Sequence, residues 1–271
     1  MADYPDLCRR LHALESVLVA YSGGVDSTLV LRAALDSLGP ERVLAVTVVS
    51  PLRPADEGPH CQQLAARLGA RHQVIPANEL TIPAVAANRA DRCYHCKHHI
   101  FSLCLQMART QGLAQVVDGT HAGDSRGYRP GRRALQELGI VSPLCDGGLD
   151  KAAIRELARQ LGLPVWDRPA APCLATRFPY DTPLTAAALQ RVGRCEQWLR
   201  TQGFTSLRVR DHGTLARIEI PPAQWPQLLD PSLRQALLLF FRAEGYQQIS
   251  LDLEGLVSGG LDRFLPQEAS P

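Results

Sequence analysis

Lysine is almost absent from this chain. Of 29 basic side chains, the only lysines are Lys97 and Lys151. No apolar run approaches the roughly 20 residues that cross a bilayer, so we expect no membrane span. The N-terminus lacks an apolar signal region with a cleavage site, so we expect a cytoplasmic protein. The formal net charge is only +2, which does not favour a nucleic-acid partner, because such proteins usually show a stronger basic bias.

The chain has eight cysteines among 271 residues. In a reducing compartment we expect most of them to be thiols rather than disulfides. Cys61, Cys104 and Cys195 fall within helical patterns, where cysteine serves as a small buried apolar residue. The hydrophobic content of 45% and charged content of 21% are those of an ordinary globular protein.

Short apolar runs alternate with amphipathic helical patterns through the first part of the chain. The runs predict five strands, at residues 17–21, 43–49, 71–77, 114–120 and 139–144. Strands that alternate with helices favour an α/β fold, a parallel sheet sandwiched by helices. In such folds ligands bind beyond the carboxyl ends of the strands.

The pattern changes after a helix that Asp150 is expected to cap. Residues 166–182 are rich in proline and irregular, and connections of that length are often functional. A helix, a hairpin around an Asp-His-Gly turn, a second helix and a strand follow, which predicts a smaller α+β unit. We therefore expect a first domain at 1–165, an interdomain active-site segment at 166–182, and a C-terminal substrate or oligomerisation domain at 183–271.

The turn "SGGVDS" joins the first predicted strand to the first helix. A helix N-terminus offers unpaired amide donors to an anion. Gly23 and Gly24 allow close approach of the backbone, while Ser22 and Ser27 add hydroxyl groups. Asp26 is a candidate ligand for Mg²⁺ beside phosphate. The lysine-bearing phosphate loop, G-x-x-x-x-G-K-[ST], is absent.

This turn resembles the PP-loop of the ATP pyrophosphatases. The resemblance implies that the protein binds ATP and Mg²⁺, transfers AMP to a substrate oxygen and releases pyrophosphate. It also places four residues at the strand ends against ATP: Ala20, Thr47, and, within "VVDGTHAGD", Gly119 and Thr120. Backbone amides, serines and Mg²⁺ then replace the missing lysine.

Cys93 and Cys96 form a C-x-x-C pair near a predicted helix start, where thiol pKa values fall. No second such pair follows, so a closed four-ligand zinc site is not expected. Some PP-loop enzymes that thiolate tRNA hold an iron–sulfur cluster on a C-x-x-C in this region. Two interpretations stay open for the pair: a structural role, or a redox, cluster or metal role.

Cys173 stands alone in the interdomain segment, four residues before Arg177. An exposed cysteine near an arginine is a candidate nucleophile. Arg208 and Arg210 alternate along a predicted strand and therefore share one face, where two guanidinium groups suit a nucleotide phosphate or a carboxylate. Together with "LRVRDHGTLARIEI" and "ISLDLEG", the stretch "RPAAPCLATRFPYDTP" resembles the LarE family of ATP-dependent sacrificial sulfur transferases.

The resemblance to LarE implies a specific chemistry. ATP adenylates a carboxylate of pyridinium-3,5-biscarboxylic acid mononucleotide, Cys173 displaces AMP, and cleavage of the Cβ–S bond leaves dehydroalanine. Arg177, Glu196, Arg208 and Arg210 are then candidate substrate-binding residues. Only one cysteine lies in the segment, so no iron–sulfur cluster is expected. The resemblance also implies a homo-oligomer.

Two alternatives remain at this level. One is a PP-loop tRNA thiolase that uses Cys93 and Cys96, which predicts RNA binding that weakens steeply with salt. The other is a non-catalytic module that binds an adenine nucleotide without releasing pyrophosphate.

Overall fold

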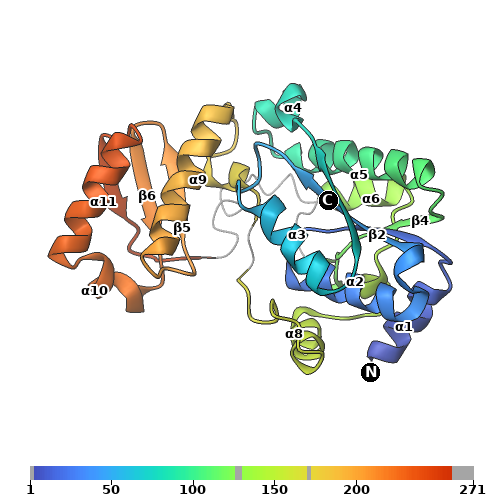
Figure 1. Cartoon of the computed structure of the whole chain (residues 1–271). Coiled ribbons are helices and arrows are strands. Elements are labelled where there is room, and N and C mark those ends of the chain that lie inside the picture. Colours follow the sequence, from blue (N-terminus) through green and yellow to red (C-terminus); the bar gives the residue numbers. More distant parts are fainter. Residues whose placement is uncertain (1–2, 126–129, 170–171, 258–271) are drawn as a thin grey trace.

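A four-stranded parallel sheet forms the centre of the first part of the protein. The computed structural model describes residues 3–125, 130–169 and 172–257. The strands are β1 (Val17–Ala20), β2 (Val43–Val49), β3 (Arg71–Pro76) and β4 (Gln115–Val117), in the order β3-β2-β1-β4 (Figure 1). The two inner strands are the most buried, which explains their continuous apolar sequence.

Helices cover both faces of this sheet. The strands alternate in the direction of their side chains, so Val17 and Val19 pack on one face and Leu18 on the other. The first face is covered by α1 (Tyr4–His12), α2 (Val25–Leu38), α3 (Glu57–Arg67) and α8 (Lys151–Gln160). The second face is covered by α5 (Arg92–Thr110) and α6 (Pro130–Glu137). The predicted α/β architecture is confirmed.

The fifth strand expected at 139–144 does not form. Val141 makes a single parallel bridge to Val117, with backbone bonds to Val116 and Asp118. Pro143 has no N–H to extend the pairing, and it begins the short helix α7 (Pro143–Asp146) instead. Helix α1 was not predicted. Asp3 caps it, and the Asp3 side chain accepts from the backbone N–H of Asp6.

Several short elements connect the main ones. They are η1 (Pro40–Arg42), η2 (Glu79–Thr81), α4 (Pro83–Ala86), η3 (Ala122–Ser125) and η4 (Leu174–Arg177). Of these, η2, α4 and η4 lie between the two parts of the molecule and prove important for the site.

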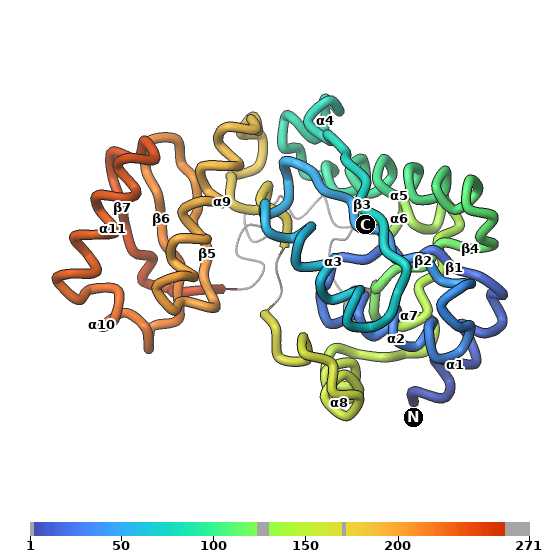
Figure 2. The backbone as a smooth tube through the Cα atoms, in the orientation of Figure 1, coloured from blue at the N-terminus to red at the C-terminus, as the bar shows by residue number. Residues whose placement is uncertain are grey.

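The C-terminal part is a small α+β unit, as predicted. It contains α9 (Ala186–Thr201), β5 (Arg208–His212), β6 (Leu215–Glu219), η5 (Pro222–Gln224), α10 (Trp225–Leu228), α11 (Pro231–Ala243) and β7 (Gln248–Leu251). The predicted hairpin is the antiparallel pair β5–β6, and β7 joins β6 in parallel (Figure 2). The limits predicted for the three domains stay a prediction.

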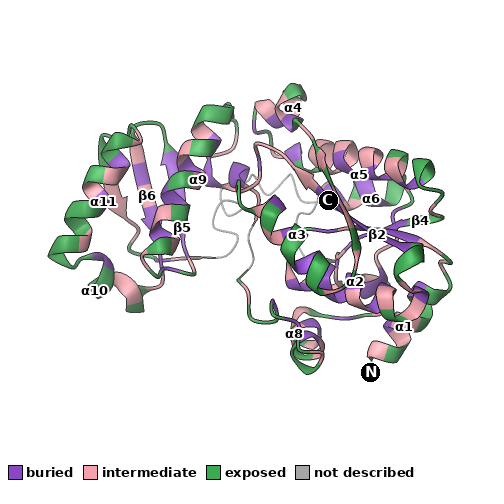
Figure 3. Cartoon of the chain, viewed as in Figure 1, coloured by how far each residue is buried: buried purple, intermediate pink, exposed green. Residues whose placement is uncertain are grey.

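Residues of the first part contribute to the core of the second. Leu52 and Val85 are buried in the same apolar cluster as α9 and the hairpin. Backbone bonds join the parts as well: Leu174 N–H donates to Leu52 O, and Leu184 N–H donates to Ala86 O. Figure 3 shows buried residues where α9 and η4 approach the first part.

The three cysteines expected in apolar surroundings, Cys61, Cys104 and Cys195, are fully buried. Burial raises their thiol pKa values above the ordinary range. Among the residues described, no helix has the length and apolar character needed to cross a membrane.

A buried ion pair holds η4 against α9. The Arg177 guanidinium donates to both carboxylate oxygens of Glu196, at 2.7 and 2.9 Å, and both side chains are at most 2% exposed. Burial acts to raise the pKa of Glu196, but Arg177 outweighs it and the pKa falls below 4.5. The pair therefore stabilises the fold above about pH 4.5, and this stabilisation is lost as pH falls through the folded-state pKa.

We expect Glu196→Gln to lower the free energy of unfolding by about 3–5 kcal/mol, because it leaves a buried guanidinium without its counter-charge. Urea unfolding at pH 7 measures this change. Glu156→Gln, which removes an exposed partner of Arg159, should change stability little. Acidification from pH 6 to pH 3 should destabilise the wild type more than the Glu196→Gln variant. Equal free energies of unfolding for the wild type and Glu196→Gln at pH 7 would show that the Arg177–Glu196 pair does not stabilise the fold.

Candidate active site

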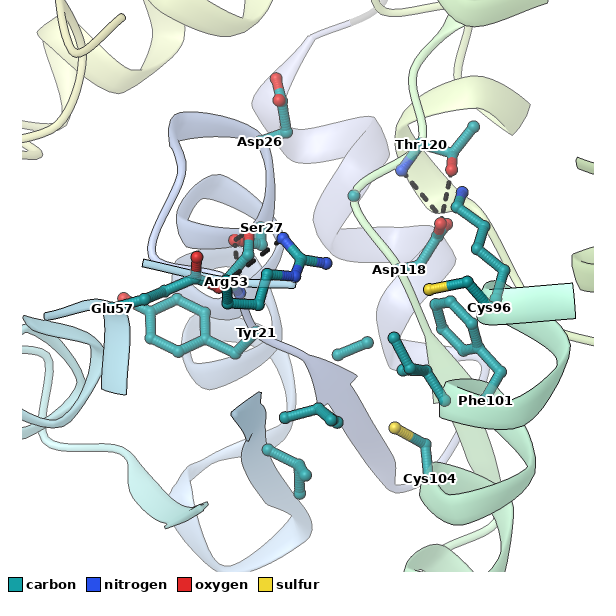
Figure 4. A pocket seen from close by; sticks show the side chains of 17 residues that line it. Tyr21, Asp26, Ser27, Arg53, Glu57, Cys96, Phe101, Cys104, Asp118 and Thr120 are labelled. Carbon is teal, nitrogen blue, oxygen red and sulfur yellow. Dashed lines mark hydrogen bonds and ion pairs between the residues drawn. The ribbon is translucent and has the colours of Figure 1, made fainter. Parts of the chain in front are cut away.

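A pocket of about 290 Å³ opens at the carboxyl ends of β1, β2 and β4, on the face covered by α5 (Figure 4). Its size is near the lower end for pockets that hold small ligands. Seventeen residues line it: Ala20, Tyr21, Ser22, Asp26, Ser27, Val46, Val48, Arg53, Glu57, Cys96, Lys97, Ile100, Phe101, Cys104, Asp118, Gly119 and Thr120. The position is the one expected for ligands of a parallel α/β sheet.

The turn between β1 and α2 has the geometry of an anion site. Among the described residues, no side chain caps the start of α2 at Gly24, so its first N–H groups have no side-chain acceptor at the positive end of the helix. Ser22 and Ser27 lie together, with their hydroxyl oxygens 3.2 Å apart. Gly23 has φ of +65°, and a Cβ there would lie 2.9 Å from Cys61 Sγ on α3. Glycine is therefore required at this position.

A lysine does reach the turn, from a distant part of the chain. Lys151 Nζ, on the first residue of α8, donates to both carboxylate oxygens of Asp26, at 2.6 and 2.7 Å. Lys97, the other lysine, lines the pocket from α5. Sequence reasoning missed both, although their rarity was a usable signal: the two lysines of the chain lie at one site.

Two arginines add positive charge around the same turn. Arg168 Nη1 lies 3.4 Å from the carbonyl oxygen of Gly23 and also contacts His60. Arg53 extends into the pocket from the segment after β2 (Figure 4) and pairs with Glu57 at 3.7 Å. Arg53 comes from an irregular segment with no local motif. Arg168 opens the stretch "RPAAPCLATRFPYDTP" but was not predicted as a site residue.

The edge at β4 places a fixed carboxylate beside the turn. Asp118 accepts from Thr120 N–H at 3.1 Å, from the Thr120 hydroxyl, and from Ser142 Oγ at 2.7 Å. A Cβ on Gly119 would lie 2.9 Å from the backbone nitrogen of Ser27. The two loops therefore contact each other closely. Gly119 and Thr120 line the pocket, and their contact with ATP stays a prediction.

Thr47 does not line the pocket. Its hydroxyl is buried, donates to the carbonyl oxygen of Tyr21 at 2.8 Å and lies 2.8 Å from His72 Nε2. Because side chains alternate along β2, Val46 and Val48 face the pocket while Thr47 points to the opposite face. The Thr47 side chain therefore does not face the pocket, and the contact of Thr47 with ATP stays a prediction. Ala20, Ser22, Asp26 and Ser27 do line the pocket.

The two residues of the C-x-x-C pair have different surroundings. Cys93 is exposed, whereas Cys96 lines the pocket. Burial, and then the nearby charge of Glu79, raises the pKa of Cys96, so the expected fall in its pKa is wrong. Glu79 is fully buried, and its Oε1 lies 3.8 Å from Cys96 Sγ.

In the part of the chain that the structure describes, no group of three or more His, Cys, Asp or Glu side chains is arranged to hold a metal. Both interpretations of the C-x-x-C pair stay predictions.

Cys173 is half-buried and lies beside the pocket rather than in its lining. The bond from Leu174 N–H to Leu52 O, 2.8 Å long, places Cys173 next to the segment that carries Arg53. Burial acts to lower the pKa of Arg53, but the carboxylate of Glu57 and other nearby acidic groups, the Cys173 side chain among them, outweigh it and raise the pKa. Arg53 thus lies within electrostatic range of both the pocket and the candidate nucleophile.

The candidate substrate-binding arginines are largely engaged within the protein. Arg177 pairs with Glu196 as described above, and Arg210 donates to both oxygens of Glu219 at 2.8 Å. Arg208 is half-buried, and its pKa is lowered to about 10, by burial first and then by the charge of Arg177. Substrate contact by these residues and by Glu196 stays a prediction.

Some known proteins are similar to the first part of this chain, and others are similar to nearly all of it. A family profile described as NAD synthase matches residues 7–106. An NH₃-dependent NAD⁺ synthetase of Hyperthermus butylicus is 33% identical over 156 residues, which is 55% of each chain. With the uncapped Ser22–Ser27 turn above a parallel sheet, these similarities define a PP-loop ATP pyrophosphatase domain, a class that binds ATP.

Two further relatives span nearly the full length. The pyridinium-3,5-bisthiocarboxylic acid mononucleotide synthase of Lactiplantibacillus plantarum is 38% identical over 262 residues, 96% of this chain and 93% of its own. An uncharacterised protein of Synechocystis is 42% identical over 252 residues, 93% of this chain and 94% of its own. The chain belongs to the LarE family.

We expect Gly119→Ala to weaken ATP binding by about tenfold or more, because the added methyl group pushes the β4 loop away from the Ser27 backbone. Calorimetric titration with ATP measures the affinity. Gly193→Ala on α9 is the control, since its Cβ meets only Leu174 at an ordinary 3.5 Å. Unchanged ATP affinity in Gly119→Ala would show that the close contact of the two loops does not shape the ATP site.

Iodoacetamide at pH 8 should alkylate Cys93, which is exposed, well before Cys96, because a half-buried thiol with a raised pKa supplies little thiolate. Peptide mass spectrometry after timed quenching gives the two rates, with buried Cys104 as an internal unreactive reference. Alkylation of Cys96 as fast as that of Cys93 would mean that the pocket leaves Cys96 open and ionised.

Proposed function

We propose that this protein is an ATP-dependent sulfur transferase that converts a carboxylate of pyridinium-3,5-biscarboxylic acid mononucleotide into a thiocarboxylate, with Cys173 as the sulfur donor. The supporting observation is the backbone bond from Leu174 to Leu52. It holds the donor cysteine beside the wall of the nucleotide pocket that Arg53 forms. The full-length similarity to the Lactiplantibacillus enzyme supports the choice of substrate.

The first step is adenylation. A substrate carboxylate attacks the α-phosphorus of ATP, and pyrophosphate leaves. The N–H groups at the start of α2 and the hydroxyls of Ser22 and Ser27 are placed to bind the leaving group. Lys151 and Arg168 add positive charge on the same side.

Mg²⁺ fits this arrangement. Asp26 lines the pocket with its side chain 26% exposed, and one carboxylate with phosphate oxygens and water is a usual ligand set for Mg²⁺ at ATP sites. When bound, the ion neutralises charge on the pyrophosphate. Lys151 then shares Asp26 with the ion or turns to a phosphate oxygen.

The second step is sulfur transfer. The Cys173 thiolate attacks the acyl adenylate, AMP leaves, and a thioester joins Cys173 to the substrate. Cleavage of the Cβ–S bond of Cys173 then releases the thiocarboxylate and leaves dehydroalanine in the chain. Arg53 is placed to stabilise the thiolate before attack.

A second candidate uses Cys96 as the sulfur-handling residue, with Cys93 as its partner, in the manner of a tRNA thiolase. Its supporting observation is that Cys96 lines the nucleotide pocket, whereas Cys173 lies beside it. The raised pKa of Cys96 argues against a nucleophile at that position.

We expect Cys173→Ala to abolish thiocarboxylate formation but to keep substrate-dependent release of pyrophosphate, because the variant alters only the second step. Intact-mass analysis of the wild type should show the loss of one H₂S, localised to Cys173, after one turnover. Cys93→Ala, Cys96→Ala and the control Cys145→Ser should behave like the wild type.

The outcomes separate the candidates. Inactivation by Cys96→Ala with normal sulfur transfer by Cys173→Ala would favour the second candidate. ATP binding with no pyrophosphate release from the wild type would favour the non-catalytic module.

A further inference from the structure

The carbonyl oxygen of Cys173 accepts an unusual number of hydrogen bonds. The backbone N–H of Thr176 donates to it at 3.1 Å, as is normal for the turn η4. The Thr176 hydroxyl donates to the same oxygen at 2.8 Å. Arg177 Nη1 also lies 3.4 Å from it, the longest of the three contacts that this NH₂ group shares among Thr176 Oγ1, Pro172 O and Cys173 O. Three donors, one of them charged, therefore converge on the backbone of the proposed sulfur donor.

These donors are fixed before any substrate binds. Arg177 Nη1 donates to Thr176 Oγ1 at 2.7 Å. Because a guanidinium can only donate, the Thr176 oxygen accepts from it, and its own hydrogen is directed to the Cys173 carbonyl. Arg177 is held in turn by both oxygens of Glu196. Arg210 Nη1 donates to the carbonyl oxygen of Thr176, which holds the turn from its other side.

Capping alone does not explain the arrangement. The turn η2 has the same local cap, with Thr81 N–H and Thr81 Oγ1 donating to Asn78 O at 3.2 and 2.7 Å. Thr81 is exposed, and no hydrogen bond found among the described residues joins an arginine to Asn78 O. The feature peculiar to η4 is a buried cation that polarises the hydroxyl and contacts the same carbonyl.

We propose that this cluster is an oxyanion hole for the enolate of Cys173, and that it drives the elimination that releases sulfur. The inference rests on the proposed function. In the thioester, the Cα proton of Cys173 passes to a carboxylate or phosphate oxygen in the pocket, of which the AMP just released is one. The C–H electron pair moves to the carbonyl oxygen of Cys173, where the three donors stabilise the negative charge.

The enolate then collapses. The carbonyl re-forms, a double bond forms between Cα and Cβ, and the Cβ–S bond breaks. The sulfur leaves with the bonding pair as the product thiocarboxylate, so no oxidant or reductant is needed. Thr176 and Arg177 are catalytic in this step because they contact the oxygen on which charge develops.

The experiment follows two masses on Cys173 after rapid quenching: the acyl adduct and dehydroalanine. In Thr176→Val the hydroxyl is lost while the backbone N–H stays. This variant should form the adduct at the wild-type rate but eliminate sulfur about 10²- to 10³-fold more slowly, the usual effect of removing one oxyanion-hole donor. Thr176→Ser should restore elimination to within a few-fold of the wild type.

Thr81→Val is the matched control, since it removes the same kind of cap from η2 and should leave both rates unchanged. Elimination by Thr176→Val at the wild-type rate would overturn the proposal. Failure of the wild type itself to form an acyl adduct on Cys173 would instead remove the proposed function.

A second measurement needs no variant. Protein made with α-deuterated cysteine should form the adduct at the normal rate and eliminate sulfur several-fold more slowly. Absence of this isotope effect would show that Cα deprotonation does not limit the step, which would also overturn the proposal.

Discussion

The buried guanidinium of Arg177 determines where Cys173 lies. An arginine carries five N–H donors that must be satisfied once water is excluded. Here Nε and Nη2 donate to Glu196, and Nη1 lies within hydrogen-bond distance of the Thr176 hydroxyl and of the carbonyl oxygens of Pro172 and Cys173. Residues 172–177 therefore fold around a charge rather than on an apolar core alone. Their backbone is held in place while the side chain of Cys173 stays half-exposed.

Most of the fold was predictable because its signals are local. The strand at 43–49 is an apolar run bounded by turn residues, and it forms over those residues. Asp150 caps α8 as its sequence indicates. The failure at 139–144 has a local cause as well: the apolar pattern was correct, but Pro143 removed the N–H that a strand requires.

The candidate site was only partly predictable. The glycines and serines of the β1–α2 turn lie together in sequence, so their role could be inferred from one short motif. Lys151 contacts Asp26 across 125 positions, and Arg53 enters from an irregular segment, so tertiary packing alone brings them to the pocket. For Thr47, the strand position indicated its depth in the sheet but not that its side chain lies on the face opposite the pocket.

The scarcity of lysine has a practical consequence. Reagents that acylate primary amines, such as those used to immobilise or biotinylate proteins, find only two side-chain targets here besides the N-terminus. One lines the nucleotide pocket and the other is bonded to Asp26. Apart from the N-terminus, such reagents therefore modify the protein only at its pocket. Attachment through an engineered tag keeps the pocket free.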